Sequence, residues 1–351
     1  MNHTVYRLSG EEDREELLKF WNENHEKNLD EKYQWIYEGN PAGKAVVFLI
    51  KDSKKGECVG CQAVFSRQFS IKGANLRAAS VGGLFVNKEY RTLWPALELG
   101  RKIISLVQDE NEFDLFYGFP NEKAQSVMKF AGFRCLGCQL RIAKPIKTSE
   151  ELQKLHIPKY VIRAISPLLD AALKICSFET WYRSKEGFIC EELSHFDERF
   201  DRLWLESKSR FQALGERTSE YLTWKFLENP DTEHKIFAIA SSDKTEVKGY
   251  IIYCDDEGSI NMRDFIFPED KRAFRIFLTH FLRHVRKVSP KSILIQLLEN
   301  KEMVHLFRKF GFVKRKSDLN AYYCCNEHVL KRFPVLEDSE NWLLLNSDLD
   351  N

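Results

Sequence analysis

Hydrophobic positions along the chain follow first a helical period and then the alternation of strands. From Glu11 to Asn24 the apolar residues fall on one helical face, and the chain then alternates apolar and polar residues in three runs. Glycines at Gly56 and Gly73 mark turns between these runs. The pattern predicts a helix followed by an antiparallel meander with strands at Ala45–Lys51, Val59–Phe69 and Leu76–Val86.

A longer amphipathic segment follows the meander. Apolar residues keep helical spacing from about Leu93 to Gln108, and a short buried strand is expected at Leu115–Phe119. Asn121 is placed to cap a helix over Glu122–Phe130, and Gly132 to end it. A final strand pair is expected after this helix.

The same order then returns in the second half of the chain. The predicted elements there are a helix at Asp197–Ser209, strands at Lys235–Ala240, Lys248–Cys254 and Ser259–Phe267, a helix at Lys271–Val288, and a strand at Ser292–Leu298. Asn300 precedes Gly311-Phe312 by eleven positions, as Asn121 precedes Gly132-Phe133. This recurrence predicts two copies of one domain.

A short motif supports the duplication. Trp35-x-Tyr37-x-x-Asn40-Pro41 returns as Trp224-x-Phe226-x-x-Asn229-Pro230. An Asn-Pro pair after aromatic residues is typical of packing followed by a turn. The alternative is that exposed aromatics here line a groove for an acceptor molecule.

The sequence predicts four regions: a first domain over residues 1–145, a helical connector over 146–190, a second domain over 191–330 and a tail over 331–351. In the connector, Pro158–Phe178 is predicted to be helical with a break near Pro167. One interpretation is a helix packed across both domains. The alternative is a basic amphipathic surface that contacts a membrane through Lys159, Arg163, Lys174 and Arg183. The tail is expected either to dock or to fray.

The composition indicates which partners and which cellular compartment to expect. The chain has 351 residues and a net charge of +1, so no charge excess favours nucleic acid. The first twenty residues have no apolar stretch typical of a signal peptide, and no segment predicts a membrane-spanning helix. These features, with an odd number of cysteines, predict a cytoplasmic protein with reduced thiols.

Two Cys-x-x-Cys pairs raise the question of zinc. They are Cys58 with Cys61 and Cys135 with Cys138, and each lies in a run that alternates like a strand. Strand residues three positions apart point to opposite faces, which suits a zinc knuckle poorly. We therefore expect buried small side chains and no metal.

The predicted order of elements resembles the GNAT acyltransferase fold. The resemblance covers nearly the whole chain as two copies. With two such copies the chain is similar to the tandem-GNAT proteins, a group that includes N-myristoyltransferase. It implies an α+β fold with two GNAT-like domains, each a mostly antiparallel mixed sheet flanked by helices.

The resemblance also implies a site for acetyl-CoA or another acyl-CoA. In the family, a strand ending in Val-x-x-x-x-Arg and a glycine-rich turn open a helix whose amides bind the pyrophosphate. Val86, Arg91 and Ala96 match this pattern, whereas Trp94 stands where the family has Gly. Asn121 matches a family position near the pantetheine, or is a plain helix cap. The implied cofactor-binding residues are Leu84, Phe85, Val86, Arg91, Thr92, Leu93, Trp94, Pro95, Ala96, Leu97 and Asn121.

The second copy departs more strongly from this pattern. Its turn, Phe267–Ala273, has no glycine, and Glu269 and Asp270 would repel a pyrophosphate. The resemblance implies that this copy forms a wall of the acceptor site instead.

The candidates for catalytic residues match the family pattern less well than the cofactor-binding residues do. The family often uses a Tyr as acid four residues before Gly-Phe, but Met128 and Phe307 stand there. A base often lies on the strand before the phosphate turn, where the second copy has Asp264; a carboxylate paired for structure is the alternative. Further candidates are Tyr90, Tyr117 and Glu89.

The prediction is therefore an N-acyltransferase that moves an acyl group directly from acyl-CoA to a small-molecule amine, such as an amino sugar or an amino acid conjugate. Two alternatives stay open: an aminoacyl transferase that uses charged tRNA, and a catalytically decayed protein that binds a ligand or partner.

Overall fold

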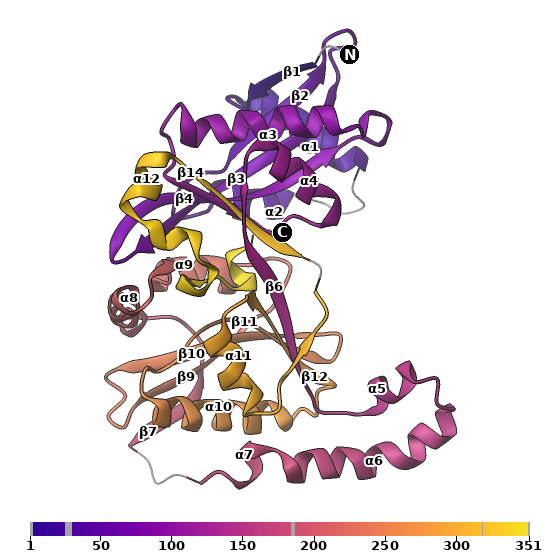
Figure 1. The fold of residues 1–351 in the computed structure, drawn as a ribbon, viewed down its shortest axis with the longest axis vertical. Helices are drawn as coiled ribbons and strands as arrows, with labels where there is room; N and C mark the ends of the chain where they lie inside the picture. Colours follow the sequence, from indigo (N-terminus) through magenta and orange to yellow (C-terminus); the bar gives the residue numbers. More distant parts are fainter. Residues whose placement is uncertain (1–2, 25–29, 184–186, 318, 350–351) are drawn as a thin grey trace. The chain divides into compact units, whose positions relative to one another are not determined.

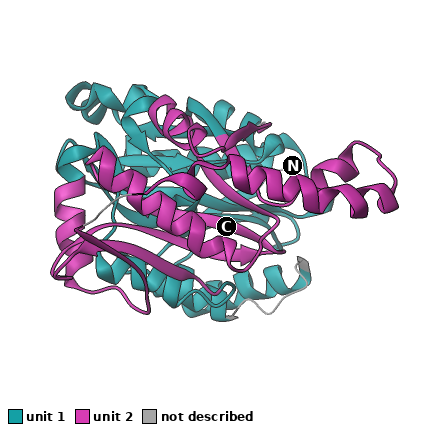
Figure 2. Cartoon of the chain, turned by 90° about the horizontal axis from the view of Figure 1, so that it is seen from below, with its two compact units in different colours: residues 1–139, 208–232, 318–351 teal, residues 140–207, 233–317 magenta. Residues whose placement is uncertain are grey.

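The computed structural model describes residues 3–24, 30–183, 187–317 and 319–349. The chain forms two compact units, and each is assembled from separate stretches of sequence. Figure 2 shows unit 1, which comprises residues 1–139, 208–232 and 318–351, in teal, and unit 2, which comprises residues 140–207 and 233–317, in magenta.

The sheet of unit 1 is a meander extended by parallel and antiparallel strands. In spatial order its strands are β1 (His3–Arg7), β2 (Val46–Asp52), β3 (Cys58–Ile71), β4 (Ala74–Val86), β5 (Leu115–Gly118), β14 (Asn320–Cys325) and β6 (Arg134–Pro145). β4 and β5 are parallel, and the other neighbours are antiparallel. The short strand β8 (Ala213–Gly215) pairs with the last residues of β3, and the short strand β15 (Trp342–Leu343) pairs with β8.

The helices of unit 1 cover this sheet. They are α1 (Glu11–Asn24), α2 (Asp30–Tyr33), α3 (Leu93–Gln108), α4 (Glu122–Ala131), α9 (Ser219–Leu222) and α12 (Glu327–Arg332). The apolar face of α3 packs on the sheet, with Leu99, Ile103 and Leu106 fully buried. Burial of such side chains is the main contribution to the stability of this layer.

Unit 2 repeats the arrangement. Its sheet order is β7 (Phe188–Leu193), β9 (Lys235–Ser241), β10 (Val247–Asp256), β11 (Ser259–Ile266), β12 (Ser292–Leu298) and the second half of β6, with β13 (Val313–Arg315) beside β6. Its helices are α5 (Ser149–Lys154), α6 (Lys159–Cys176), α7 (Phe178–Trp181), α8 (Glu198–Arg210), α10 (Lys271–Arg286) and α11 (Lys301–Arg308). As α3 does in unit 1, α10 buries a row of large apolar side chains, among them Phe277 and Phe281.

The compact units do not follow the linear domain boundaries expected from the sequence. β14 comes from the end of the second copy, yet it lies between β5 and β6 in unit 1. Conversely, the second half of β6, from the first copy, lies between β12 and β13 in unit 2. The two copies thus exchange their last strands, because each sheet can satisfy its backbone hydrogen bonds with an equivalent strand from either copy.

Most predicted elements are present, and several have the expected bounds, such as α1, α3 and β12. Two expectations are wrong. The strand pair after Gly132 is one long strand, β6, and α6 continues through Pro167 without a break. A proline removes only one helical N–H, and here the helix tolerates that loss.

The repeated Trp-x-aromatic motif forms a reciprocal contact inside unit 1. Each copy of the motif folds as a short π-helix, at Gln34–Glu38 and Thr223–Leu227. The indole of Trp35 donates to the carbonyl oxygen of Trp224 at 2.7 Å, and the indole of Trp224 donates to that of Trp35 at 2.9 Å. The motif is therefore a packing element, which supports the simpler of the two interpretations.

The tail docks on unit 1. Trp342 is 1% exposed and packs on Phe69. The carboxylate of Asp348 accepts two hydrogen bonds from the guanidinium of Arg217, and both side chains are buried. The last two residues of the predicted tail, 350 and 351, lie outside the described residues.

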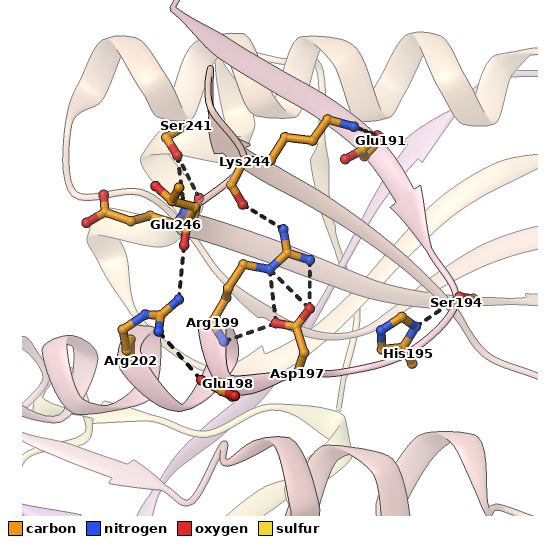
Figure 3. Close-up of polar contacts among 11 residues, drawn as sticks. Glu191, Ser194, His195, Asp197, Glu198, Arg199, Arg202, Ser241, Lys244 and Glu246 are labelled. Atoms are coloured by element: carbon orange, nitrogen blue, oxygen red, sulfur yellow. Dashed lines mark hydrogen bonds and ion pairs between the residues drawn. The ribbon is translucent and has the colours of Figure 1, made fainter.

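A polar network fixes the start of α8 in unit 2 (Figure 3). Arg199 forms a two-point ion pair with Asp197 and donates to the carbonyl oxygen of Lys244 at 3.0 Å. Arg202 donates to the carbonyl oxygen of Thr245 in the same β9–β10 turn. These contacts tie the first turn of α8 to that turn.

Among the described residues, no helix has both the length and the apolar character needed to cross a lipid bilayer.

Candidate functional site

The two parallel strands β4 and β5 diverge in unit 1. β4 pairs with β5 only over Ala78–Ser80, opposite Leu115–Tyr117. β4 continues to Val86, whereas β5 ends at Gly118. Beyond Ser80, the backbone groups of β4 that face away from β3 therefore have no β5 residue to pair with among the described residues.

A β-bulge lies where the strands diverge. Cys61 of β3 is opposite Phe85, but Ala63 is opposite Gly82, so β4 carries one extra residue. Gly83 has φ +60°, and a Cβ there would lie 3.2 Å from the hydroxyl of Tyr37. Only glycine fits this backbone without strain. This bulge was not predicted from the sequence, although the Gly82-Gly83 pair inside a strand is a signal for one.

The turn after β4 leads directly into α3. A short 3₁₀ turn at Lys88–Tyr90 follows Val86, and Arg91 folds back so that its Nε donates to the carbonyl oxygen of Val86 at 2.9 Å. Thr92 is the N-cap of α3 and makes no side-chain capping bond. The amides of Leu93 and Trp94, which begin the helix, have no acceptor within it. This end of α3 thus offers N–H groups and a positive dipole end.

Trp94 is directed into solvent. Its side chain is 51% exposed, and the guanidinium of Arg101 lies 5.8 Å from the ring centroid. The residues that follow it, Pro95, Ala96 and Leu97, are buried. Trp94, which stands at the glycine position of the family's turn, therefore leaves its indole ring at the surface of α3.

The equivalent turn of unit 2 differs in chemistry. Asp270 is the N-cap of α10, and its carboxylate accepts from the amide of Ala273 at 2.7 Å. A negative side chain therefore already occupies the end of the helix where an anion would bind. This contact supports the expectation that unit 2 does not bind a pyrophosphate at this turn.

Of the four catalytic candidates, Glu89 is exposed on the 3₁₀ turn Lys88–Tyr90, and the other three have different surroundings. The hydroxyl of Tyr117 donates to the backbone oxygen of Asp348 at 3.1 Å, and the side chain is 1% exposed. The hydroxyl of Tyr90 donates to Asp52 at 3.1 Å. Both tyrosines belong to unit 1, whereas Asp264 belongs to unit 2.

Asp264 is fully buried on β11. Its carboxylate accepts from the hydroxyl of Tyr250 at 3.2 Å and from the amide of Phe265 at 2.9 Å. It directly follows a second bulge, at Arg263, since Ile252 is opposite Asp264 and Tyr253 is opposite Met262. The catalytic roles of these three candidates stay predictions.

Asn121 caps α4 through its side-chain oxygen, which accepts from the amide of Ala124 at 3.0 Å. Asn300 does the same for α11, with the amide of Met303 as donor. The same cap in both copies supports a structural role for the asparagine. Met128 and Phe307, at the positions of the family's acid, are buried apolar side chains.

The paired cysteines lie on strands, at Cys58 and Cys61 of β3 and Cys135 and Cys138 of β6. Burial raises the pKa of Cys61 to about 12 and that of Cys58 to about 11. Thiols of this kind resist the deprotonation that metal binding needs. In the described part of the chain, no group of three or more His, Cys, Asp or Glu side chains is placed to hold a metal ion.

Comparison with known proteins gives structural relatives but no sequence relatives. No protein-family model matches the chain, and no curated protein matches it by sequence. A probable N-acyltransferase from Enterococcus faecalis V583 superposes with a TM-score of 0.64 at 12% identity, over 93% of this chain and 73% of the other.

Two further solved structures resemble both halves of the chain. A tandem GNAT protein from the clavulanic acid biosynthesis pathway matches with a TM-score of 0.55 at 9% identity, over 92% of this chain and 98% of that one. The N-myristoyltransferase of Saccharomyces cerevisiae, solved with bound myristoyl-CoA, matches with a TM-score of 0.54 at 11% identity, over 92% and 80%. Together with the strand order of each unit, these matches show that the chain has the α+β fold of tandem GNAT proteins.

Proposed function

We propose that the protein is an N-acyltransferase that binds acyl-CoA in unit 1. The observation that carries this proposal is the divergence of β4 from β5 beside the uncapped start of α3. Among the described residues, the end of β4 has no β5 residue to pair with, and the first amides of α3 have no acceptor within the helix; both border the turn Asn87–Thr92. Such an arrangement suits a ligand that carries an amide-rich arm and a pyrophosphate.

Each part of the site would have its own task. The amides of Leu93 and Trp94 and the guanidinium of Arg91 would hold the pyrophosphate. An N–H of the Leu84–Val86 segment would donate to the thioester oxygen, where negative charge develops during attack. Gly83 places an extra residue in β4, and such a bulge bends the strand locally, which would aim an N–H of this segment at a ligand.

The proposed reaction is a direct transfer. The neutral amine of the acceptor attacks the thioester carbon, the carbon–sulfur bond breaks, and the proton lost by the attacking nitrogen is transferred to the leaving thiolate. A base must first accept the proton of the ammonium group. Tyr90, which belongs to unit 1 and is partly exposed, is the proposed candidate for this proton transfer. Asp264 and Tyr117 are almost fully buried, at 0% and 1% exposed.

The structural relatives support the donor class but not the acceptor. One of them is described as a probable N-acyltransferase and another was solved with myristoyl-CoA. At 9–13% identity they support a fold, so the acyl group and the amine are part of the proposal. We propose a small amine such as an amino sugar or an amino acid conjugate.

A thermal-shift titration with acetyl-CoA tests the proposal. A ligand at about 100 times its Kd should stabilise the folded protein by about 2.7 kcal/mol. We expect Arg91→Ala to remove most of the shift and Arg332→Ala, which removes an exposed arginine elsewhere in unit 1, to leave it unchanged. If acetyl-CoA, CoA and myristoyl-CoA all give no shift with the wild type, unit 1 does not bind acyl-CoA.

A second candidate is a binding protein that has lost catalysis. The observation in its favour is the burial of Met128 and Phe307, which cannot donate a proton, at the positions of the family's acid. The release of free CoA in the presence of a panel of amines separates the two. Ligand-dependent stabilisation with no release of CoA for any amine would favour the binding protein.

A further inference from the structure

One face of α6 is apolar and open to solvent. Tyr160, Ala164, Leu168, Ala171 and Ile175 are spaced at four, four, three and four residues, so they form one stripe along the helix. All five are exposed; Tyr160 is 77%, Leu168 73% and Ile175 57% exposed. Ile162 is the one described α6 residue that is buried. This is the reverse of the burial expected for an amphipathic helix that packs on its own domain.

Two more exposed apolar side chains flank the helix. Leu155, just before α6, and Trp181, in α7, are each 69% exposed. Figure 1 shows α5, α6 and α7 as a pink arm of unit 2, with α6 passing beyond the end of the sheet strands of that unit. Tyrosine and tryptophan are the side chains that favour the boundary between water and lipid.

Basic side chains border the apolar stripe. Lys159, Arg163 and Lys174 project from the adjacent face of α6, all exposed, and no carboxylate of the described residues forms an ion pair with them. The sequence from Lys147 to Arg183 holds six Lys or Arg residues against four Asp or Glu residues.

The acidic residues of the arm are instead engaged within unit 2. Asp170 accepts from the amide and hydroxyl of Thr148, Glu150 pairs with Lys291, and Glu151 pairs with Arg315. Their carboxylates thus have partners within unit 2, whereas the basic side chains beside the apolar stripe form no ion pair with the residues that the structure describes.

The α7 end of the arm is held to α10 by ion pairs and hydrogen bonds. Glu179 is 1% exposed and forms ion pairs with Lys144 and with Arg286 of α10. Arg283 donates to the carbonyl oxygens of Glu179 and Tyr182. The exposed stripe therefore belongs to a helix whose base has defined contacts, and not to a loose segment.

We propose that α6 docks on the surface of an anionic lipid bilayer. A helix with an apolar face, a basic border and aromatic side chains is suited to lie in the plane of the bilayer surface, with its apolar face among the acyl chains and its cations at the lipid phosphates. The charge pattern favours this occupant, because cations that form no ion pair with the described residues, and that lie beside apolar groups, complement an anionic headgroup layer. The docked surface consists of Leu155, Tyr160, Leu168, Ile175 and Trp181, bordered by Lys159, Arg163 and Lys174.

Vesicle co-sedimentation with the full chain tests this inference. We expect binding to vesicles that contain phosphatidylserine and much weaker binding to phosphatidylcholine alone, with binding reduced by added salt. The double substitution Leu168→Glu/Ile175→Glu should abolish binding. Leu205→Glu/Val288→Glu changes two exposed apolar residues of unit 2 outside the arm, and it should bind like the wild type.

A second variant set tests the charges. Lys159→Gln, Arg163→Gln and Lys174→Gln should each weaken binding to the anionic vesicles roughly fivefold. All these positions are exposed, so unchanged thermal unfolding should accompany the loss of binding. The proposal is overturned if the wild type does not bind anionic vesicles, if it binds neutral ones equally well, or if analytical ultracentrifugation shows a dimer that the α6 double substitution dissociates.

Discussion

At the scale of single residues, buried charges show how the tail is held. Arg217 and Asp348 are both almost fully buried and form a two-point ion pair inside unit 1. The backbone oxygen of Asp348 accepts from Tyr117, and Lys225 donates to the backbone oxygen of Leu349 at 2.9 Å. One short segment thus provides hydrogen-bond acceptors for three buried polar side chains, those of Arg217, Tyr117 and Lys225.

Asp348→Asn should therefore destabilise the protein strongly, because it removes the carboxylate that forms the two-point ion pair with the buried guanidinium of Arg217. We expect a loss of about 3–5 kcal/mol in the free energy of unfolding, measured by urea denaturation. Asp231→Asn removes an exposed ion pair with Lys32 and should cost less than about 1 kcal/mol. Equal effects of the two substitutions would contradict this account.

The ion pair between Asp197 and Arg199 predicts a pH dependence. Hydrogen bonds from Arg199 hold the pKa of Asp197 below its usual value, because they favour the charged carboxylate. Its contribution to stability is present above the unfolded-state pKa and is lost as the pH falls through the lower folded-state pKa. The stability difference between wild type and Asp197→Asn should shrink between pH 6 and pH 3 in denaturation series, and a difference that grows towards acid pH would refute this.

At the scale of elements, the bulge in β4 decides what the strand can do. Both β4 and β11 contain an extra residue at corresponding places, but only β4 is followed by a helix start without an acidic cap. The duplicated elements therefore share a backbone shape and differ in chemistry. This difference is the reason to place acyl-CoA in unit 1.

Gly83→Ala should disturb the bulge. A Cβ at this positive φ costs about 1–2 kcal/mol, and it would also press on the hydroxyl of Tyr37. We expect a lower unfolding temperature of the free protein and a smaller rise in that temperature on addition of acetyl-CoA. Gly10→Ala, where a Cβ meets no heavy atom within 4 Å, is the matched control and should change neither quantity. If Gly83→Ala kept both the thermal stability and the acetyl-CoA thermal shift of the wild type, the bulge would not be required for either.

At the scale of the whole molecule, the exchange of strands joins the two copies. Unit 1 needs β14 from the end of the chain to complete its sheet, and unit 2 needs the second half of β6. Neither copy contains all the strands of one unit in one continuous stretch. We infer that folding of the units is linked through these two strands.

Truncation after residue 317 should consequently unfold unit 1, because it removes β14 and Asp348 and exposes the edges of β5 and β6. Hydrogen exchange should show loss of protection in β5, which is fully buried in the complete chain. The fragment 1–145 should likewise fail to unfold cooperatively. A stable, cooperatively unfolding fragment would contradict the linkage.

The order and type of most elements could be predicted from the amino-acid sequence alone, because periodicity, caps and turns are local signals. Asn121, Gly132 and Asn300 show this well, since each acts at the helix end where its residue type predicts it. The duplication was also readable, because the Trp-x-aromatic motif repeats with constant spacing.

The assignment of strands from each copy to the two sheets, and the directions of the Trp94 and Tyr117 side chains, became known only from the folded chain. A strand's apolar pattern specifies that it is buried but not which neighbour pairs with it, so the exchange of β14 and β6 left no local signal. The exposed stripe of α6 is the converse case: its periodicity was visible, but a helix's apolar face is normally taken as buried, and only its surroundings show that it is not.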